Sequence, residues 1–207
     1  MGCDIHFYVE KHYGKAWHAV QSPKSIMSSW DKRKRQYDWF VSRSYLLFGI
    51  LAGVRVDNFI TPIDPRGMPD DASPIVNSKY AAWRGDAHTP SYIYLNELLD
   101  FTSIESEREV WMNVLDYKKF KNNDNNLLDT LFWEPYKSQV VSIDEMDRLV
   151  NLLAFSNDNR EVDKYVNIKA KLPITAFISH FWQSHVFEMK KLDKDPAKVR
   201  CVFWFDN

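Results

Sequence analysis

The stretch Asp4-Ile5-His6-Phe7-Tyr8-Val9-Glu10 decides the fold, because its apolar side chains alternate with polar or aromatic ones. Such alternation is typical of a strand that buries one face. Tyr13-Gly14-Lys15 then predicts a turn into a second strand at 16–20, which makes the N-terminus a hairpin. Residues 199–205 alternate in the same way, and strands at the two ends of a chain commonly pair. We therefore expect both ends of the chain in one sheet.

Helices are expected to pack on this sheet. Apolar residues at helical spacing predict helices over 43–52, 105–121, 143–155 and 175–190, and further strands are predicted over 92–95 and 164–171. Ser44 is a predicted N-cap, Gly53 a predicted C-terminal stop, and Ser142 to Glu145 match a capping box. The predicted fold class is α+β, with a mainly antiparallel sheet that contains the N-terminal hairpin and the C-terminal strand, and with helices on one face.

Length and composition set the class of protein. The 207 residues fit one domain, or one domain plus an insertion, and we predict a single domain over 1–207. Lys plus Arg number 27 against 28 Asp plus Glu, and this balance argues against a stable complex with nucleic acid. Aromatic residues make up 15% of the chain, so some rings are expected to face a ligand or partner.

The expected location is the cytoplasm. The chain has only two cysteines, lacks a secretory signal at its start, and contains no apolar stretch of the roughly 20 residues that a membrane crossing needs. No membrane partner is therefore expected.

Residues 55–91 are predicted to be a turn-rich functional segment. Five of the nine prolines lie within them, and spaced apolar residues favour an ordered loop over disorder. Within this segment Arg66 accompanies two carboxylates, Asp70 and Asp71, and the loop either binds a ligand or braces itself. Both interpretations carry equal weight.

Two Asp-x-His motifs carry candidate chemistry: Asp4-Ile5-His6 and Asp86-Ala87-His88. Side chains two apart on a strand point the same way, so each motif sets a carboxylate beside an imidazole. Together they could supply a general acid and base, or ligands for a divalent metal. The alternative is that each His is a hydrogen-bonded polar residue at a sheet edge, and two copies leave the alternatives nearly even.

Arg43-Ser44-Tyr45 sets a planar cation beside a predicted helix N-terminus, an arrangement that receives a phosphate or a carboxylate. A salt bridge to Asp70 or Asp71 is the alternative. Aromatic side chains that could meet such a ligand are Tyr45, Trp83, Tyr92 and Trp39.

Two further features of the sequence give weaker evidence of function. The basic run 32–35, flanked by aromatic residues, could hold nucleic acid, but a solvated loop is favoured about three to one. Cys3 stands beside Asp4, which disfavours a thiolate and counts against a nucleophile unless His6 or His88 offsets it.

Four separated motifs in the first hundred residues resemble a family of small proteins from tailed phages and bacteria. They are Met1 to His6, Arg43 to Phe48, Pro65 to Asp71 and Gly85 to Ser91, in the family's order. The family more often has Gly and Ser where this chain has Ala87 and Thr89. The resemblance implies no reaction, but it groups seven residues as one site: Asp4, His6, Arg43, Arg66, Asp70, Asp86 and His88.

Two functions remain open at this point. The first is a phage accessory protein that binds a phosphate-bearing, nucleotide-derived small molecule in the host cytoplasm and sequesters a host defence signal, with Arg43, Tyr45, Arg66, Trp83 and Tyr92 as ligand contacts. The second is a phosphoester hydrolase with His6, His88, Asp4 and Asp86 as catalytic residues, with or without a divalent metal. A surface that docks on another protein is a third interpretation, and the oligomeric state, homo-oligomers included, is left open.

Overall fold

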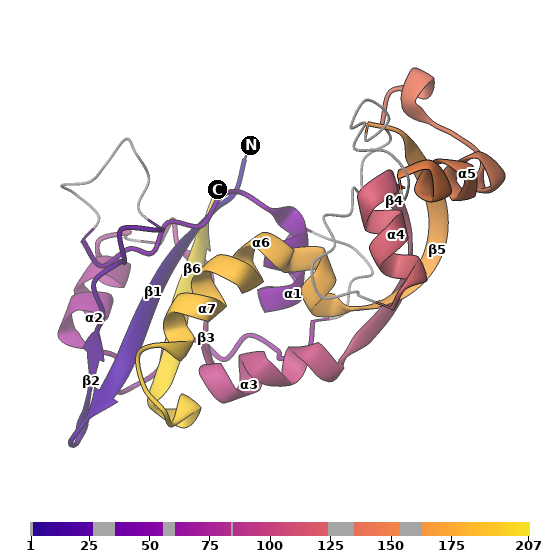
Figure 1. Cartoon of the computed structure of the whole chain (residues 1–207). Coiled ribbons are helices and arrows are strands. Elements are labelled where there is room, and N and C mark those ends of the chain that lie inside the picture. The colour runs from indigo at the N-terminus through magenta and orange to yellow at the C-terminus, as the bar shows by residue number, and fades with distance from the viewer. Residues whose placement is uncertain (1, 27–35, 56–60, 84, 124–134, 154–162) are drawn as a thin grey trace. The chain divides into compact units, whose positions relative to one another are not determined.

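The computed structural model describes residues 2–26, 36–55, 61–83, 85–123, 135–153 and 163–207. Its contacts divide the chain into two compact units (Figure 1). The first unit comprises residues 1–101 and 180–207, and the second comprises residues 102–179.

The first unit contains a four-stranded sheet in the order β2-β1-β6-β3, and every neighbouring pair is antiparallel. The strands are β1 (Asp4–Tyr13), β2 (Ala16–Ala19), β3 (His88–Tyr94) and β6 (Val199–Asp206). The N-terminal hairpin, the C-terminal strand and the α+β class are therefore confirmed. Asp4 lies opposite Asp206, so the two ends of the chain meet at one end of the sheet.

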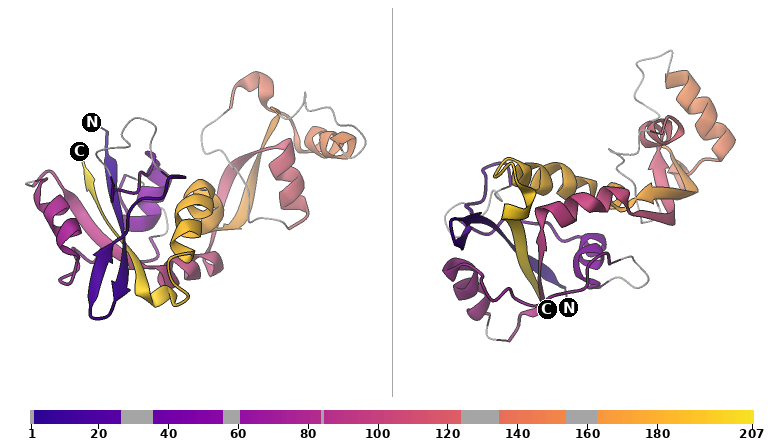
Figure 2. Two further views of the ribbon diagram at one scale, coloured as in Figure 1. Left: turned by 60° about the vertical axis from the view of Figure 1, so that its left-hand side comes forward. Right: turned by 90° about the horizontal axis from the view of Figure 1, so that it is seen from below.

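Both faces of this sheet are covered, although helices were expected on one face only. The α2 helix (Pro74–Ala81) covers the face that carries Tyr8, Val202 and Trp204. Figure 2 shows α1 (Tyr45–Ala52) and α6 (Ser179–Phe181) on the opposite side from α2. That face carries Phe7, which contacts Phe181, and Phe205, which contacts Phe48. Both central strands, β1 and β6, consequently belong to the core.

The α1 helix (Tyr45–Ala52) has the predicted caps. The Ser44 hydroxyl accepts a hydrogen bond from the Leu47 N–H, and Gly53 adopts φ 65° in the left-handed region. Side chains with a Cβ are disfavoured there, so glycine ends the helix at low cost.

We expect Gly53→Ala to lower the free energy of unfolding by about 1 kcal/mol, because alanine is strained in that conformation. Urea denaturation measures the change. Gly53→Asn is the control and should lose less, since asparagine tolerates the left-handed region better. Equal stability of Gly53→Ala and the wild type would contradict this account.

The turn-rich segment contains more regular structure than the sequence indicated. The α2 helix lies inside it, and β3 begins at His88 rather than near Tyr92. Ser73 caps α2, with Pro74 at its first position. This Ser-Pro pair was a readable start signal, but the helix has little amphipathic pattern, so spacing alone did not reveal it. Residues 56–60 and 84 lie outside the described residues.

The second unit pairs β4 (Glu105–Asn113) with β5 (Tyr165–Pro173) and adds α4 (Val114–Lys121) and α5 (Ile143–Leu153). The helix predicted over 105–121 is therefore wrong in its first half. Long-range pairing with β5 holds residues 105–113 extended, and local spacing does not report such pairing. The strand predicted over 164–171 and the Ser142 cap of α5 are confirmed.

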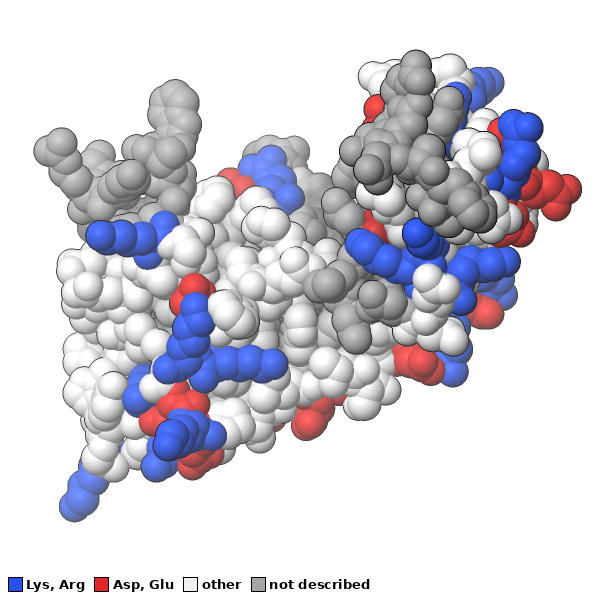
Figure 3. Space-filling view, viewed as in Figure 1, with Lys and Arg blue, Asp and Glu red and all other residues white. Residues whose placement is uncertain are grey.

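Charged side chains of both signs lie close together on the second unit (Figure 3). Between the paired strands β4 and β5, Lys169 forms an ion pair with Glu107 at 2.8 Å and Lys171 with Glu105 at 2.6 Å. Exposed pairs of this kind stabilise a fold little and suit a solvated face.

The helix predicted over 175–190 is present but irregular. The chain runs through a 3₁₀ segment (Ile174–Ile178), α6 (Ser179–Phe181), a π-helical segment (Trp182–Val186) and α7 (Phe187–Lys190). Short elements complete the fold: α3 (Leu95–Asp100) and the 3₁₀ turns Phe101–Ser103, Lys137–Gln139 and Pro196–Lys198.

Candidate functional site

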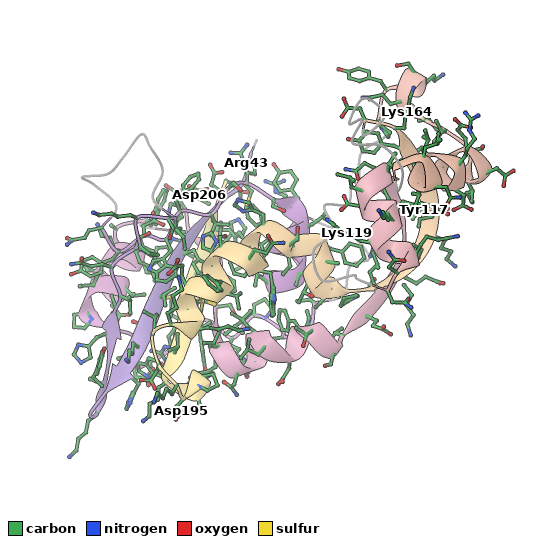
Figure 4. The ribbon with its side chains drawn as sticks, in the orientation of Figure 1. Arg43, Tyr117, Lys119, Lys164, Asp195 and Asp206 are labelled. Atoms are coloured by element: carbon green, nitrogen blue, oxygen red, sulfur yellow. The ribbon has the colours of Figure 1, made fainter. Side chains whose placement is uncertain are left out.

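Polar and aromatic side chains gather at the end of the first unit where the two chain termini meet. Five of them form what we call the terminal cluster: Asp4, His6, Arg43, Trp83 and Asp206. Figure 4 labels Arg43 and Asp206 at this end of the sheet, where Figure 1 marks N and C.

Arg43 is held by Asp4 through two hydrogen bonds. Its Nε–H donates to Asp4 Oδ1 and its Nη2 to Asp4 Oδ2, each at 2.9 Å. The Arg43 side chain is nevertheless 49% exposed, and its Nη1 has no hydrogen-bond partner among the described residues. A Cβ on Gly2 would lie 2.4 Å from Nη1, so a larger residue there would require the guanidinium to shift. The cluster therefore presents a fixed cation to solvent.

His6 is oriented by Asp206, not by Asp4. His6 Nε2 lies 3.2 Å from Asp206 Oδ2, and the Asp4 backbone N–H donates to Asp206 Oδ1 at 3.0 Å. The sequence predicted that the terminal strands pair, but it did not give the register that sets Asp206 opposite Asp4. A partner 200 positions away leaves no local signal.

Two tryptophans enclose the His6 ring. The centroid of Trp83 lies 4.1 Å from that of His6, and the centroid of Trp204 lies 5.7 Å away. Trp204 is fully buried, yet its Nε1–H finds no acceptor within the part of the chain described here. An unsatisfied buried donor costs about 1–3 kcal/mol, and such groups in native proteins call for an explanation.

The structure does not bring the two Asp-x-His motifs together. His6 stacks on Trp204 and His88 on Phe205, and consecutive residues of a strand point to opposite faces. Asp86 is exposed in the turn before β3. Among the described residues, no group of three or more His, Cys, Asp or Glu side chains is placed to hold a metal ion.

His88 instead lies against Cys3, and we call these two residues the thiol pair. Cys3 Sγ is 4.0 Å from His88 Nε2, while His88 Nδ1 lies 3.0 Å from Thr89 Oγ1. Burial raises the pKa of the Cys3 thiol above its usual value, and the Arg55 guanidinium opposes that rise. Thr89 and Arg55 both have positive φ, at 48° and 64°, although neither is glycine.

The turn-rich loop braces itself. Arg66 donates from Nη1 and Nη2 to the two carboxylate oxygens of Glu97, at 2.8 and 2.6 Å, and lies over the Tyr92 ring. Burial would raise the pKa of Glu97, but hydrogen bonds from Arg66 and from the Tyr94 backbone lower it overall. Arg66 is therefore less available to a ligand than Arg43. Asp70 is exposed, as is Tyr45 at 40%.

A buried ion pair that the sequence did not reveal anchors this loop to the sheet. Arg200 is 1% exposed, and its Nε–H donates to Glu10 Oε2 at 2.8 Å. Its Nη1 donates to Asp71 Oδ1 at 2.7 Å, and the guanidinium lies over the Trp17 ring. Burial would raise the pKa of Asp71, but the bonds from Arg200 and Trp17 lower it overall. The sequence hinted at this ion pair only through one charged residue in each of the two alternating stretches, Glu10 in residues 4–10 and Arg200 in residues 199–205.

A hollow of about 350 Å³ lies at the other end of β1. Four lysines, one aspartate and one leucine line it: Lys11, Lys190, Lys191, Leu192, Asp193 and Lys194. Lys11 bridges the Leu192 carbonyl and Asp193. Because the hollow follows the C-terminus of α7, where lysines offset the partial negative charge of the carbonyls, these residues have a structural explanation.

Within the described ranges no helix is long and apolar enough to cross a membrane. The basic run 32–35 lies outside the described residues, so its expected solvation stays a prediction. Comparison with family models, with curated proteins and with solved structures finds no match to this chain.

Proposed function

We propose that the terminal cluster binds a phosphate-bearing, nucleotide-derived small molecule. The observation that carries this proposal is the Arg43 guanidinium, which Asp4 fixes through Nε and Nη2 while Nη1 faces no protein acceptor among the described residues. A guanidinium held in this way has already lost its rotamer freedom, so a phosphate that binds it need not order it.

The exposure of the Arg43 guanidinium suits it to bind an anionic ligand. The Asp4–Arg43 pair is about half exposed, and exposed pairs contribute little to stability, so a phosphate can share or displace Asp4. Arginine binds phosphate through paired, charge-assisted hydrogen bonds. His6 adds a second donor when it is protonated. The pair between Arg66 and Glu97 is less exposed, and we assign Arg66 to bracing the loop.

Aromatic side chains beside the cation suit a nucleotide base. Tyr45 is exposed at the start of α1 and lies close enough to Arg43 to contribute, after Asp4, to the raised pKa of the guanidinium. Trp83 is partly exposed and lies next to His6. Aromatic rings stack on any base, so Tyr45 and Trp83 are the side chains that suit the base of a nucleotide.

The resemblance to phage proteins supports a role in the cytoplasm of an infected cell. We propose that the ligand there is a host defence signal. The protein would remove this signal either by keeping it bound or by converting it to another molecule. The acid–base version of the hydrolase hypothesis has less support, because His6 and His88 lie on opposite faces of the sheet.

The test is ligand-induced stabilisation with a matched pair of arginine variants. Cyclic and linear adenine and guanine nucleotides are titrated against the wild type, Arg43→Met and Arg66→Met, and the shift in Tm is recorded. We expect a nucleotide to stabilise the wild type and Arg66→Met, and to bind Arg43→Met at least tenfold more weakly. Absence of any stabilisation, or equal weakening by both variants, would count against the terminal cluster.

A further inference from the structure

We propose that Cys3 is a nucleophile and His88 its proton carrier, and that together they cleave a phosphoester held at the adjacent terminal cluster. This inference rests on the proposed function for the ligand class, but its evidence is separate. It comes from the thiol pair, which the terminal cluster does not include.

Three elements converge on the thiol. Cys3 precedes β1, His88 begins β3 and Arg55 follows α1, and the Sγ of Cys3 lies 4.0 Å from His88 Nε2. A carbon-bound thiol and an imidazole nitrogen at this separation need only a small movement to exchange a proton. Thr89 Oγ1, 3.0 Å from His88 Nδ1, fixes the ring so that Nε2 faces the sulfur. The arrangement follows the order of nucleophile, base and orienting group.

Cations surround the same segment. Arg55 interacts with the thiol and donates from Nη2 to Asn207 Oδ1 at 2.7 Å. Arg43 lies against Gly2, the neighbour of Cys3, because a Cβ on Gly2 would touch its guanidinium. Two guanidiniums thus flank the residue and favour a bound phosphate, and Arg55 opposes, without cancelling, the rise that burial gives to the pKa of the Cys3 thiol.

Cys3 is buried, but it is only one residue from the surface on either side. Gly2 and Asp4 are both exposed, and so is Arg55. Reaction therefore requires a local movement of the covering side chains. Cys201 offers the contrast, because both of its neighbours in the chain are buried as well and burial raises its pKa to about 12.

The proposed reaction balances in two steps. The Cys3 proton passes to His88 Nε2, the sulfur forms a bond to phosphorus, the ester P–O bond breaks, and the leaving oxygen takes the proton from His88. Water then attacks phosphorus and gives a proton to His88, while the S–P bond breaks. For a monoester substrate the product is inorganic phosphate. His88 then returns its proton to the Cys3 sulfur, which restores the thiol and the neutral imidazole.

The first experiment measures the reactivity of both cysteines in the folded chain. Iodoacetamide is added at several pH values, and the alkylated peptides are quantified by mass spectrometry. We expect Cys3 to react at least a hundredfold faster than Cys201, and His88→Gln to slow Cys3 at least tenfold without changing Cys201. Equal inertness of the two cysteines, or no effect of His88→Gln, would overturn the proposal.

The second experiment measures turnover with p-nitrophenyl phosphate. Release of p-nitrophenol by the wild type should fall at least a hundredfold in Cys3→Ser and at least tenfold in His88→Gln, while His18→Gln, at an exposed position on β2, keeps the wild-type rate. No release by the wild type, or equal release by Cys3→Ser, would overturn this inference alone if nucleotides still stabilise the chain through Arg43. Loss of that stabilisation would instead overturn the proposed function.

Discussion

Arg200→Met is expected to lower the free energy of unfolding by about 3–5 kcal/mol, which is the usual cost of removing one partner of a buried ion pair. The Glu10 side chain is 0% exposed, and without Arg200 its carboxylate keeps, among the described residues, only the hydrogen bond from the Ser73 backbone N–H, at 2.7 Å. Asp71 would lose its ion pair and keep the hydrogen bond from Trp17. Urea denaturation followed by tryptophan fluorescence and circular dichroism measures the change.

Two variants show whether the loss comes from the charge left behind. Glu10→Gln combined with Arg200→Met should be more stable than Arg200→Met alone, because no uncompensated charge remains in the core. Arg66→Met breaks an ion pair at the surface and should cost no more than about 1 kcal/mol. If Arg200→Met proves as mild as Arg66→Met, the buried network does not anchor the loop.

The sequence predicts the sheet well because its pattern is local and repeats. Residues 4–10 and 199–205 alternate with period two, and each forms a strand close to the expected bounds. The α1 caps are equally local, since Ser44 and Gly53 each act on backbone groups within one turn. Strand alternation and helix caps can be predicted because they depend on residues that are close together in the sequence.

The candidate site is predicted only in part, because its partners come from distant positions. Arg43, Asp4 and His6 were expected in one site, and the structure places them in one cluster. Asp206 was not expected there, because the register of β1 against β6 decides its position. The separation of His6 from His88 has the same origin. The sequence grouped both motifs in one site, but His6 pairs with Trp204 and His88 with Phe205, and these consecutive residues of β6 send the two rings to opposite faces.

For residues 105–113 the local pattern itself was misleading, because it predicted a helix where the structure has a strand. Their polar content and later apolar spacing suit a helix, but nine cross-strand pairings with β5 hold them extended. Asn113 then caps α4, accepting the Asp116 N–H at 2.9 Å, so the helix begins where the pairing ends. Tertiary pairing outweighs propensities that differ by only a few tenths of a kcal/mol per residue.

His185 should make the first unit acid-labile. Its ring lies against Phe7 and Phe181, and its Nε2 donates to the Phe40 carbonyl at 2.9 Å. Because a carbonyl only accepts, Nε2 carries the proton of the neutral ring. Burial lowers the pKa of His185 from 6.5 to about 4, against a smaller opposing effect of the Phe40 hydrogen bond.

The sign of the effect follows from this depressed pKa. The unfolded chain binds the proton more tightly than the folded one, so the contribution of His185 to stability is complete above pH 6.5. It is lost as the pH falls from 6.5 to about 4, and the total loss is about 3 kcal/mol. Below that range both states are protonated and His185 adds no further pH dependence.

The measurement compares the wild type with His185→Gln by urea denaturation between pH 7.5 and 4. Glutamine keeps a donor for the Phe40 carbonyl but cannot be protonated, so the difference in unfolding free energy between the two proteins should fall by about 3 kcal/mol over this range. His18→Gln, at an exposed position on β2 of the same unit, controls for the loss of a histidine and should follow the wild type. A difference in unfolding free energy that does not change with pH would contradict this prediction, because protonation of the buried His185 ring would then cost no stability. The packing against Phe7 and Phe181 would in that case have to rearrange to accommodate the charge.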